Sequence, residues 1–409
     1  MVRGGVMIGQ SGGPTSVINS SLAGIFKAAK DNGCKKIYGM RNGIEGLILG
    51  RYVDIFDYIS SDLDVELLKR TPSSFLGTCR YKLPPPEDAP EVYERIFGIL
   101  SRLGVEYFFY IGGNDSMDTV MQLSRYGASI GSPVRFMGVP KTIDNDLACT
   151  DHTPGYGSAA KYIATAMKEI IRDARTYPND SVTIVEIMGR NAGWLAAAAS
   201  LSRAEDCEGP DLIYLPERVF DHESFLARTE KCRSDRGAAV VAVSEGIRTA
   251  DGRYVCEANK ASTVTDAFGH KLLGGTALYL SDFLTERCGV KSRGIVLSTL
   301  QRCASHLVSR RDITEAFMAG ADAASAAFAG EGGKMIVFKR ISDTPYSMVT
   351  DICDIEKIAN REKKIPDEWI TSDGTYVTEE FDTYARPLII GELSPFMVDG
   401  LPRHLFIDK

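Results

Sequence analysis

Short apolar runs that alternate with longer amphipathic stretches most strongly constrain the fold of this 409-residue chain. The runs lie at residues 5–9, 36–40, 107–111, 134–139, 181–188, 212–215, 238–243, 294–299 and 334–338. Between the first two runs, Ile18, Leu22, Phe26 and Ala29 recur at helical spacing, which is typical of one buried helix face. The alternation predicts parallel sheets covered by helices, and the length allows two doubly wound α/β lobes with an extension.

Three segments rich in glycine and polar residues follow predicted strands, at the edge where open α/β sheets bind ligands. Residues 10–15 (Gln-Ser-Gly-Gly-Pro-Thr) follow the first strand, and residues 112–116 (Gly-Gly-Asn-Asp-Ser) follow the third. Paired glycines let the backbone approach a phosphate closely, and we expect Ser116 to cap a helix over residues 117–126.

The third segment, residues 138–146 (Gly-Val-Pro-Lys-Thr-Ile-Asp-Asn-Asp), brings a lysine, a hydroxyl and two carboxylates together. A carboxylate can accept the proton of an attacking hydroxyl, and a second one can bind Mg²⁺. A lysine can neutralise phosphate oxygens. These are the groups that a phosphoryl transferase needs.

Composition argues against several other classes of protein. The net charge of −7 leaves no basic surplus for a nucleic-acid backbone. No apolar run has the length of a membrane span, and the N-terminus lacks a signal-peptide pattern, so we expect no membrane partner. The nine scattered cysteines contain no Cys-x-x-Cys pair, which favours reduced core residues of a cytoplasmic protein over disulfides or a zinc site.

The order of the motifs resembles the phosphofructokinase family, and more closely its pyrophosphate-dependent branch. Thr142–Asp146 is similar to the family's catalytic run. Glu186–Arg190 with Ala192–Leu195 is similar to its sugar-phosphate strand, and Glu245-Gly246, Arg293 and Gln301-Arg302 follow in the same order as in the family. The resemblance covers roughly residues 4 to 340. It implies a donor-binding lobe at 1–143, a sugar-phosphate lobe at 144–302, and a return crossing with a C-terminal extension at 303–409. Residues 346–409 lie beyond the matched core and either cap the fold or build an interface.

The resemblance also implies the roles of individual residues. The implied donor-binding residues are Gly12, Gly13, Arg80, Gly113, Asp115, Ser116 and Lys141. The implied sugar-phosphate residues are Thr142, Asp144, Met188, Gly189, Arg190, Glu245, Arg293 and Arg302. Lys141, Thr142, Asp144 and Arg190 would be catalytic, with Asp144 as the general base, and Asn114 and Asp146 would hold Mg²⁺. Taken singly, Asp144 could instead be a helix cap, and Arg190 or Glu245 part of an ordinary ion pair.

Two positions bear on the phosphoryl donor. ATP-dependent relatives carry glycine where this chain has Asp115 and Lys141, so a carboxylate here opposes an α-phosphate and a lysine favours compact pyrophosphate. ATP remains the alternative donor.

Most relatives have aspartate at Asn114, which leaves an inactive sugar-phosphate-binding or regulatory subunit as a further alternative. Ser181 and Thr299 stand where relatives carry larger side chains, which leaves sedoheptulose 7-phosphate conceivable as a substrate.

The implied reaction transfers phosphoryl from pyrophosphate to fructose 6-phosphate and forms fructose 1,6-bisphosphate and phosphate. In the family, the arginine that matches Arg293 reaches the 6-phosphate bound in the neighbouring subunit. We therefore expect a homo-oligomer, either a dimer or a dimer of dimers.

Overall fold

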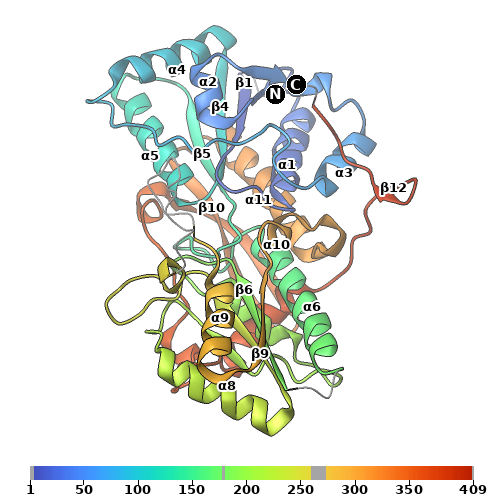
Figure 1. Cartoon of the computed structure of the whole chain (residues 1–409). Helices are drawn as coiled ribbons and strands as arrows, with labels where there is room; N and C mark the ends of the chain where they lie inside the picture. The colour runs from blue at the N-terminus through green and yellow to red at the C-terminus, as the bar shows by residue number, and fades with distance from the viewer. Residues whose placement is uncertain (1–3, 177–179, 259–272, 408–409) are drawn as a thin grey trace.

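Two β-sheets, one in each half of the molecule, organise the chain in the computed structural model, which describes residues 4–176, 180–258 and 273–407 (Figure 1). The larger sheet has seven strands in the order β11-β10-β5-β4-β1-β2-β3, and the smaller has four in the order β7-β8-β6-β9. The strands of the larger sheet are β1 (Gly5–Gln10), β2 (Ile37–Met40), β3 (Tyr52–Asp54), β4 (Val105–Gly112), β5 (Arg135–Pro140), β10 (Lys334–Asp343) and β11 (Tyr346–Asp354). Those of the smaller sheet are β6 (Ser181–Ile187), β7 (Leu212–Tyr214), β8 (Ala238–Ser244) and β9 (Lys291–Val296).

Most neighbouring strands run parallel. In the larger sheet β2–β3 and β10–β11 are antiparallel and the other pairs are parallel, while the three pairs of the smaller sheet are all parallel. The predicted α/β class with largely parallel sheets is confirmed. One strand is displaced from its predicted place: the run at 294–299 contributes only its first residues to β9, because the chain turns at Ser298, whose φ is +48°.

Helices cover both faces of the larger sheet. On one face lie α1 (Ile18–Asp31) and α11 (Arg310–Phe328), and on the other lie α4 (Pro90–Leu103) and α5 (Asn114–Ser129). Successive strand residues enter opposite cores, as Phe109 and Phe108 of β4 do. Helices α1 and α11 touch through glycines, because a Cβ at Gly24 would lie 2.1 Å from the Phe317 carbonyl oxygen.

The smaller sheet is covered in the same way. Helices α6 (Tyr156–Ala174), α7 (Trp194–Ala197) and α12 (Glu379–Ala385) share the core of one face. Helices α8 (His222–Arg236) and α9 (Thr276–Cys288) cover the other. The remaining α-helices of the described residues are α2 (Gly43–Ile48), α3 (Asp62–Arg70) and α10 (Leu300–Cys303).

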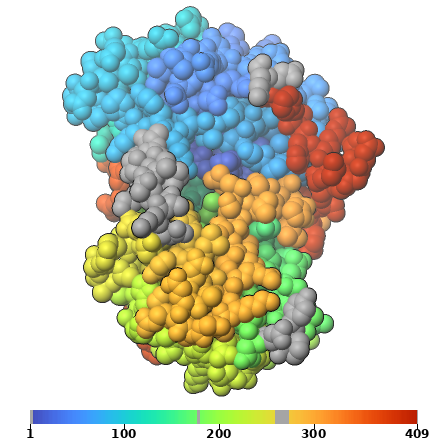
Figure 2. All heavy atoms as spheres, viewed as in Figure 1, coloured from blue at the N-terminus to red at the C-terminus, as the bar shows by residue number. Residues whose placement is uncertain are grey.

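The chain beyond residue 346 extends over both halves of the molecule. Strand β11 joins the larger sheet, and α12 places Phe381 and Tyr384 in the core of the smaller half. The hairpin β12 (Met397–Val398) and β13 (Leu401–Pro402) then lies beside the upper half (Figures 1 and 2). No helix in the described ranges has both the length and the apolar character needed to cross a membrane.

All nine cysteines are free thiols. Cys34, Cys79 and Cys256 are buried as predicted, whereas Cys149 and Cys288 are exposed. The prediction that the cysteines are core residues is therefore wrong for these two, because both lie outside the interiors of the helices and strands that form the cores.

Candidate active site

A cavity of about 620 Å³ lies where the carboxyl ends of β1, β4 and β5 face those of β6 and β8. Figure 2 shows a recess on this face, between the upper (blue) and lower (green to orange) halves. The predicted residues on its lining are Gly12, Gly13, Arg80, Gly113, Asn114, Asp115, Ser116, Lys141, Thr142, Asp144, Asp146, Met188, Arg190, Glu245 and Arg302. The structure thus brings together residues separated by almost three hundred positions, at the sheet edge where α/β proteins bind ligands.

Two predicted residues do not line this cavity. The amide of Gly189 lies just behind the lining, with its nitrogen 3.4 Å from Glu245 Oε1. The guanidinium of Arg293 is on β9, is 63% exposed and lies 3.9 Å from Asp173. The role predicted for Arg293 in a neighbouring subunit stays a prediction.

The glycine loop after β1 forms one wall of the cavity. Gly12 has φ of +75°, a conformation that favours glycine, and its carbonyl accepts a hydrogen bond from Thr78 Oγ1 at 2.7 Å. Thr15 Oγ1 accepts hydrogen bonds from the amides of Val17 and Ile18, so it holds the turn that leads into α1, whose N-cap is Val17. The loop is therefore fixed at both ends while its two glycines face the cavity.

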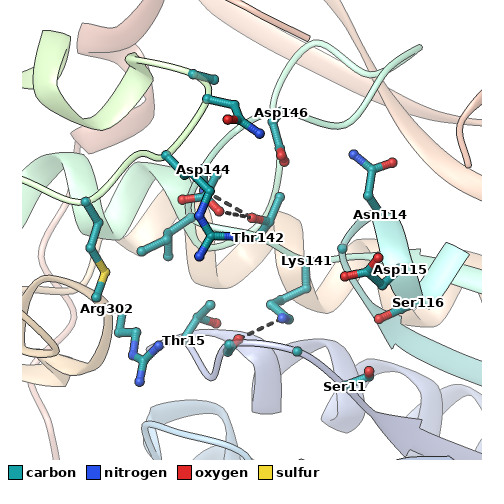
Figure 3. A pocket seen from close by; sticks show the side chains of 18 of the residues that line it. Ser11, Thr15, Asn114, Asp115, Ser116, Lys141, Thr142, Asp144, Asp146 and Arg302 are labelled. Carbon is teal, nitrogen blue, oxygen red and sulfur yellow. Dashed lines mark hydrogen bonds between the residues drawn. The ribbon is translucent and has the colours of Figure 1, made fainter. Parts of the chain in front are cut away.

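Helix α5 begins at the cavity and directs its N-terminus toward it (Figure 3). Its N-cap is Gly113, so the prediction that Ser116 caps the helix is wrong: Ser116 is already the third helical residue. The helix starts earlier because Ser116 and Met117 both donate their amides to the Gly113 carbonyl, at 3.0 Å. A helix N-terminus behind a glycine pair is a suitable site for phosphate oxygens.

Lys141 is a buried cation among the predicted donor-binding residues. Its side chain is 2% exposed, and Nζ donates a hydrogen bond to the Gly13 carbonyl at 2.7 Å. A Cβ at Gly12 would lie 3.3 Å from the same nitrogen, so the glycine loop closes directly over the ammonium. Burial lowers the pKa of Lys141 to about 8, against the attraction of Asp144. The lysine is still mostly charged at neutral pH and can meet a compact anion.

Asp144 and Thr142 face each other across the turn after β5 (Figure 3). The Asp144 amide donates to Thr142 Oγ1 at 3.1 Å, and Thr142 Oγ1 donates to Asp144 Oδ2 at 3.4 Å. Burial raises the pKa of Asp144 above its ordinary value, although Lys141 and Arg190 oppose this rise. The neighbouring Asn145, with φ of +55°, donates to the Tyr384 hydroxyl at 2.8 Å and holds the turn from below.

The residues of this cavity fit a divalent cation. The amide of Asn114 donates through Nδ2 to the Arg361 carbonyl at 3.0 Å, which leaves its Oδ1 buried without a hydrogen-bond partner. Burial, then Asp144 and Glu362, raise the pKa of Asp146 to about 7, a cost that a bound cation would relieve. Within the described ranges no cluster of three or more acidic, histidine or cysteine side chains could hold a metal. A site with few protein oxygens and several substrate oxygens is typical of Mg²⁺.

The smaller half supplies several of the predicted sugar-phosphate residues on the cavity wall. Met188 and Arg190 follow β6, and the Met188 amide donates to Gln301 Oε1 at 3.1 Å. A Cβ at Gly246 would lie 2.0 Å from the Arg190 carbonyl oxygen, so the glycine permits this close approach. Burial raises the pKa of Glu245 to about 7.

Sequence reasoning missed several lining residues. Ser11 and Thr15 belong to a segment that was recognised, and Asn191 lies between two recognised motifs. Asn360 and Glu362 also line the cavity, although they come from the extension beyond the matched core. No local pattern in the sequence marks these two, because it is the folded path of the C-terminal chain that brings them to the cleft.

The fold and the site define an enzyme of the phosphotransferase class. A model of the family described as phosphofructokinase matches residues 5–327, and the chain belongs to this family.

Named relatives match more of the chain than the family model does. A protein of Halomonas elongata named pyrophosphate–fructose 6-phosphate 1-phosphotransferase is 39% identical, over 98% of this chain and 96% of its own. One of the same name from Methylococcus capsulatus is 41% identical, over 97% and 94%. The crystal structure of a pyrophosphate-dependent phosphofructokinase from Nitrosospira multiformis is similar, with a TM-score of 0.88 and 36% identity over 98% of this chain and 95% of that one.

Proposed function

We propose that this protein transfers a phosphoryl group from pyrophosphate to the 1-hydroxyl of fructose 6-phosphate, giving fructose 1,6-bisphosphate and phosphate. The observation that carries the proposal is the single cavity in which a buried lysine, a glycine loop and a helix N-terminus face the carboxylate of Asp144. Both substrates also stand in the names of relatives that match nearly the whole chain.

Asp144 acts as the general base in this reaction. Its carboxylate accepts the proton of the sugar 1-hydroxyl while the oxygen attacks phosphorus, and the bond to the bridging oxygen of pyrophosphate breaks. A raised pKa makes the carboxylate a stronger acceptor, and Lys141 and Arg190 counteract its protonation. Thr142 Oγ1 holds the orientation of Asp144.

The donor residues stabilise charge that spreads over the transferring oxygens. Lys141 and Arg80 line the donor side as cations, and the N-terminus of α5 adds its amides. Arg302 approaches the glycine loop, since a Cβ at Gly13 would lie 3.5 Å from its Nη1. We assign Arg302 to the sugar 6-phosphate. We assign Arg190 and Glu245 to the sugar itself.

Asn114 and Asp146 would hold Mg²⁺ as the cofactor of this reaction. When bound, the cation neutralises donor charge and orients the leaving phosphate. The unpartnered Oδ1 of Asn114 supports this assignment, because a neutral amide oxygen can ligate a hard cation.

The arrangement of the chain follows from these roles. Residues 1–143 serve the donor, residues 144–302 serve the sugar phosphate, and residues 303–409 return to the first part and extend over both. We also propose a homo-oligomer in which Arg293 reaches the sugar phosphate of a neighbouring subunit. Its exposure on an edge strand of the smaller sheet supports this role. The free thiols fit a cytoplasmic enzyme.

A donor comparison tests the proposal. Initial rates with fructose 6-phosphate are measured with pyrophosphate and with ATP, using aldolase-coupled detection of the bisphosphate. We expect turnover with pyrophosphate and little with ATP, since Asp115 and Lys141 line the donor side. Replacing both by glycine should lower pyrophosphate use and admit ATP, while the control Lys141→Arg keeps the cation. Equal or better use of ATP by the wild type would refute the assignment of the donor.

A further inference from the structure

The C-terminal strap, defined as residues 360–363, lies along the cavity wall through Asn360 and Glu362, and its first residues are bonded to α5 on the donor side. Asn360 Nδ2 donates to Asp118 Oδ1 of α5 at 2.9 Å. The carbonyl of Arg361 accepts from Asn114 Nδ2 at 3.0 Å. The first half of the strap therefore lies against the N-terminal part of α5.

The second half of the strap is bonded to the turn after β5, which carries Asp144 and Asp146, and to the sugar-phosphate side. The Lys363 amide donates to the Asp146 carbonyl at 2.7 Å, and Glu362 forms an isolated antiparallel bridge with Leu147. Glu362 Oε1 accepts from Asn191 Nδ2 at 2.9 Å. The strap thus joins α5, the turn that carries Asp146, and the loop after β6.

Both proposed cation ligands depend on the main chain of the strap. Asn114 has one donor nitrogen and one acceptor oxygen, so engaging its nitrogen with Arg361 decides where Oδ1 points. Asp146 is tied to Lys363 through its own carbonyl, which fixes the backbone from which its carboxylate projects. A shift of the strap would therefore move both ligands together.

We propose that Glu362 is a positioning residue of the active site, which holds the strap across the cleft through Asn191 and thereby sets the two cation ligands. The inference rests on the proposed function, because it assigns a role within the same site. Glu362 needs no contact with the reacting atoms for this role. Its carboxylate acts through Asn191 on one side and through the strap on the other.

The strap has a separate anchor that lets this contact be broken without unfolding the chain. Lys363 Nζ donates to the carbonyls of Thr150 and Asp151, at 3.1 and 2.6 Å, and lies 5.0 Å from the ring centre of Trp194. The indole of Trp194 donates back to the Lys363 carbonyl at 3.0 Å. Loss of the Glu362–Asn191 bond should therefore loosen the strap while its end stays attached.

The test uses Glu362→Ala, Asn191→Ala, the double variant and the conservative Glu362→Gln, in the full-length protein. The matched control is Glu368→Ala, an exposed carboxylate six residues further along the chain. Binding of Mn²⁺ is measured by electron paramagnetic resonance with saturating methylenediphosphonate, a pyrophosphate analogue with an uncleavable bridge. kcat and the KM for fructose 6-phosphate are measured in parallel.

We expect the dissociation constant for Mn²⁺ to rise about five-fold in each alanine variant, the factor that one hydrogen bond of ordinary net strength supplies. The double variant should be no worse than either single variant, since both remove the same bond. Glu362→Gln keeps the acceptor oxygen and should stay within about two-fold of the wild type. kcat should fall with Mn²⁺ affinity, while the KM for the sugar changes little.

Several results would overturn the inference. The alanine variants could bind Mn²⁺ as tightly as Glu368→Ala does. Glu362→Gln could bind Mn²⁺ as weakly as Glu362→Ala, or the losses of Mn²⁺ affinity in the double variant could be additive. A change confined to the KM of the sugar, or no Mn²⁺ binding by the wild type, would do the same. Absence of pyrophosphate turnover in the wild type would instead sink the proposed function, since the Mn²⁺ measurement does not depend on turnover.

Discussion

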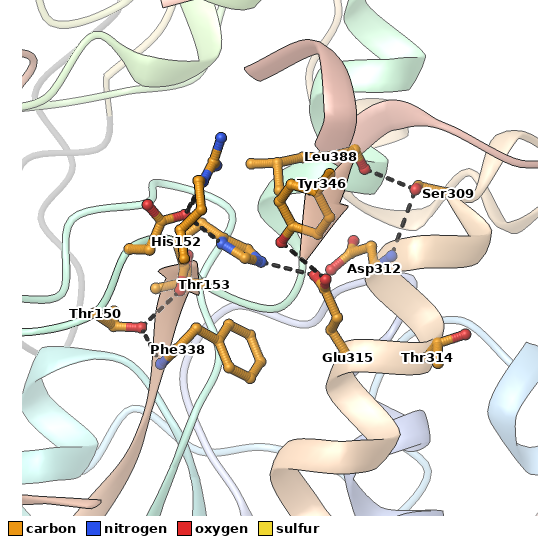
Figure 4. Close-up of polar contacts among 12 residues, drawn as sticks. Thr150, His152, Thr153, Ser309, Asp312, Thr314, Glu315, Phe338, Tyr346 and Leu388 are labelled. Atoms are coloured by element: carbon orange, nitrogen blue, oxygen red, sulfur yellow. Dashed lines mark hydrogen bonds and ion pairs between the residues drawn. The ribbon is translucent and has the colours of Figure 1, made fainter. Parts of the chain in front are cut away.

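A buried ionic cluster around His152 should contribute measurably to stability (Figure 4). His152 is 2% exposed, and its two ring nitrogens lie 2.8 Å from Asp151 Oδ1 and Glu315 Oε2. Two carboxylate partners require both nitrogens to donate, so the ring is charged. Burial by itself lowers the pKa of His152, but Glu315 and Asp151 outweigh it and raise the pKa above its ordinary value.

The cost of removing the ring can be worked out from what each carboxylate retains. In His152→Ala, Asp151 keeps Arg340 at 2.9 Å, whereas Glu315 keeps only the hydroxyl of Tyr346 at 2.9 Å. Breaking a buried ion pair on one side costs about 3–5 kcal/mol, and the remaining partners favour the lower end. An unfolding entropy of about 2.1 cal/mol/K per residue over the whole chain then gives a fall in Tm of roughly 3–4 °C.

The dependence on pH has a defined sign. Because the pKa of His152 is raised in the folded state, the stabilisation is fully present below the ordinary histidine pKa of about 6.5 and is lost as pH rises through the folded value. The groups that face the ring are Asp151 with Arg340, and Glu315 with Tyr346. The difference in Tm between wild type and variant should therefore be largest near pH 6 and smaller at pH 9.

Thermal unfolding followed by differential scanning fluorimetry at both pH values checks this prediction. The double variant His152→Gln/Glu315→Gln replaces the ion pair by neutral amides and should recover part of the loss. His306→Gln, at an exposed histidine, is the control. A Tm within 1 °C of the wild type at pH 6, or a difference that does not change with pH, would show that the cluster does not stabilise the fold as a charged unit.

Four further predictions concern the site. Asp144→Asn should lower kcat by about 10²–10⁴-fold with little change in the KM of the sugar, and a large rise in that KM would contradict the role of a base. kcat/KM for pyrophosphate should fall above about pH 8, where Lys141 of the enzyme without pyrophosphate loses its charge. Lys141→Arg should move this fall in kcat/KM to higher pH. Asn114→Asp should lower the Mg²⁺ concentration for half activity, because an added carboxylate favours a hard cation, and an unchanged requirement would separate this residue from the metal. Asp144→Asn and Arg293→Ala, each nearly inactive alone, should together recover about a quarter of wild-type activity on co-expression as a dimer, since half of the dimers are mixed and contain one intact site; no recovery despite subunit mixing would place Arg293 outside the neighbouring site.

Local patterns in the sequence determined most of the strands, the first helix and the order of the site segments, but missed β3, β11 and the hairpin β12–β13. Ile18, Leu22, Phe26 and Ala29 are all buried on α1, as their spacing predicted. The reason is that the period of a helix or strand and the chemistry of a glycine loop are set by residues close together in the chain. The sequence also placed residues 112–116 and 138–146 at the ligand-binding edge of a sheet, because parallel strands end at one edge.

The start of a helix was less well determined. The sequence could not decide whether α5 begins before or after Ser116, since glycine and serine both occur at helix N-termini. The structure shows that Gly113 takes the N-cap position and that its carbonyl accepts two amides of the first turn. The loop conformation after β4, which depends on packing in the cleft, decides between these alternatives.

Only the tertiary structure decided the long-range contacts around the candidate site. The bond from Asn114 to Arg361 spans 247 positions, that from Asn191 to Glu362 spans 171, and the contact of His152 with Glu315 spans 163. No period or motif relates such pairs, because each forms only when separate elements have packed around a common core. The candidate site residues were therefore visible in the sequence, whereas the contacts of the strap and of the buried ion cluster emerge only from the folded path of the chain.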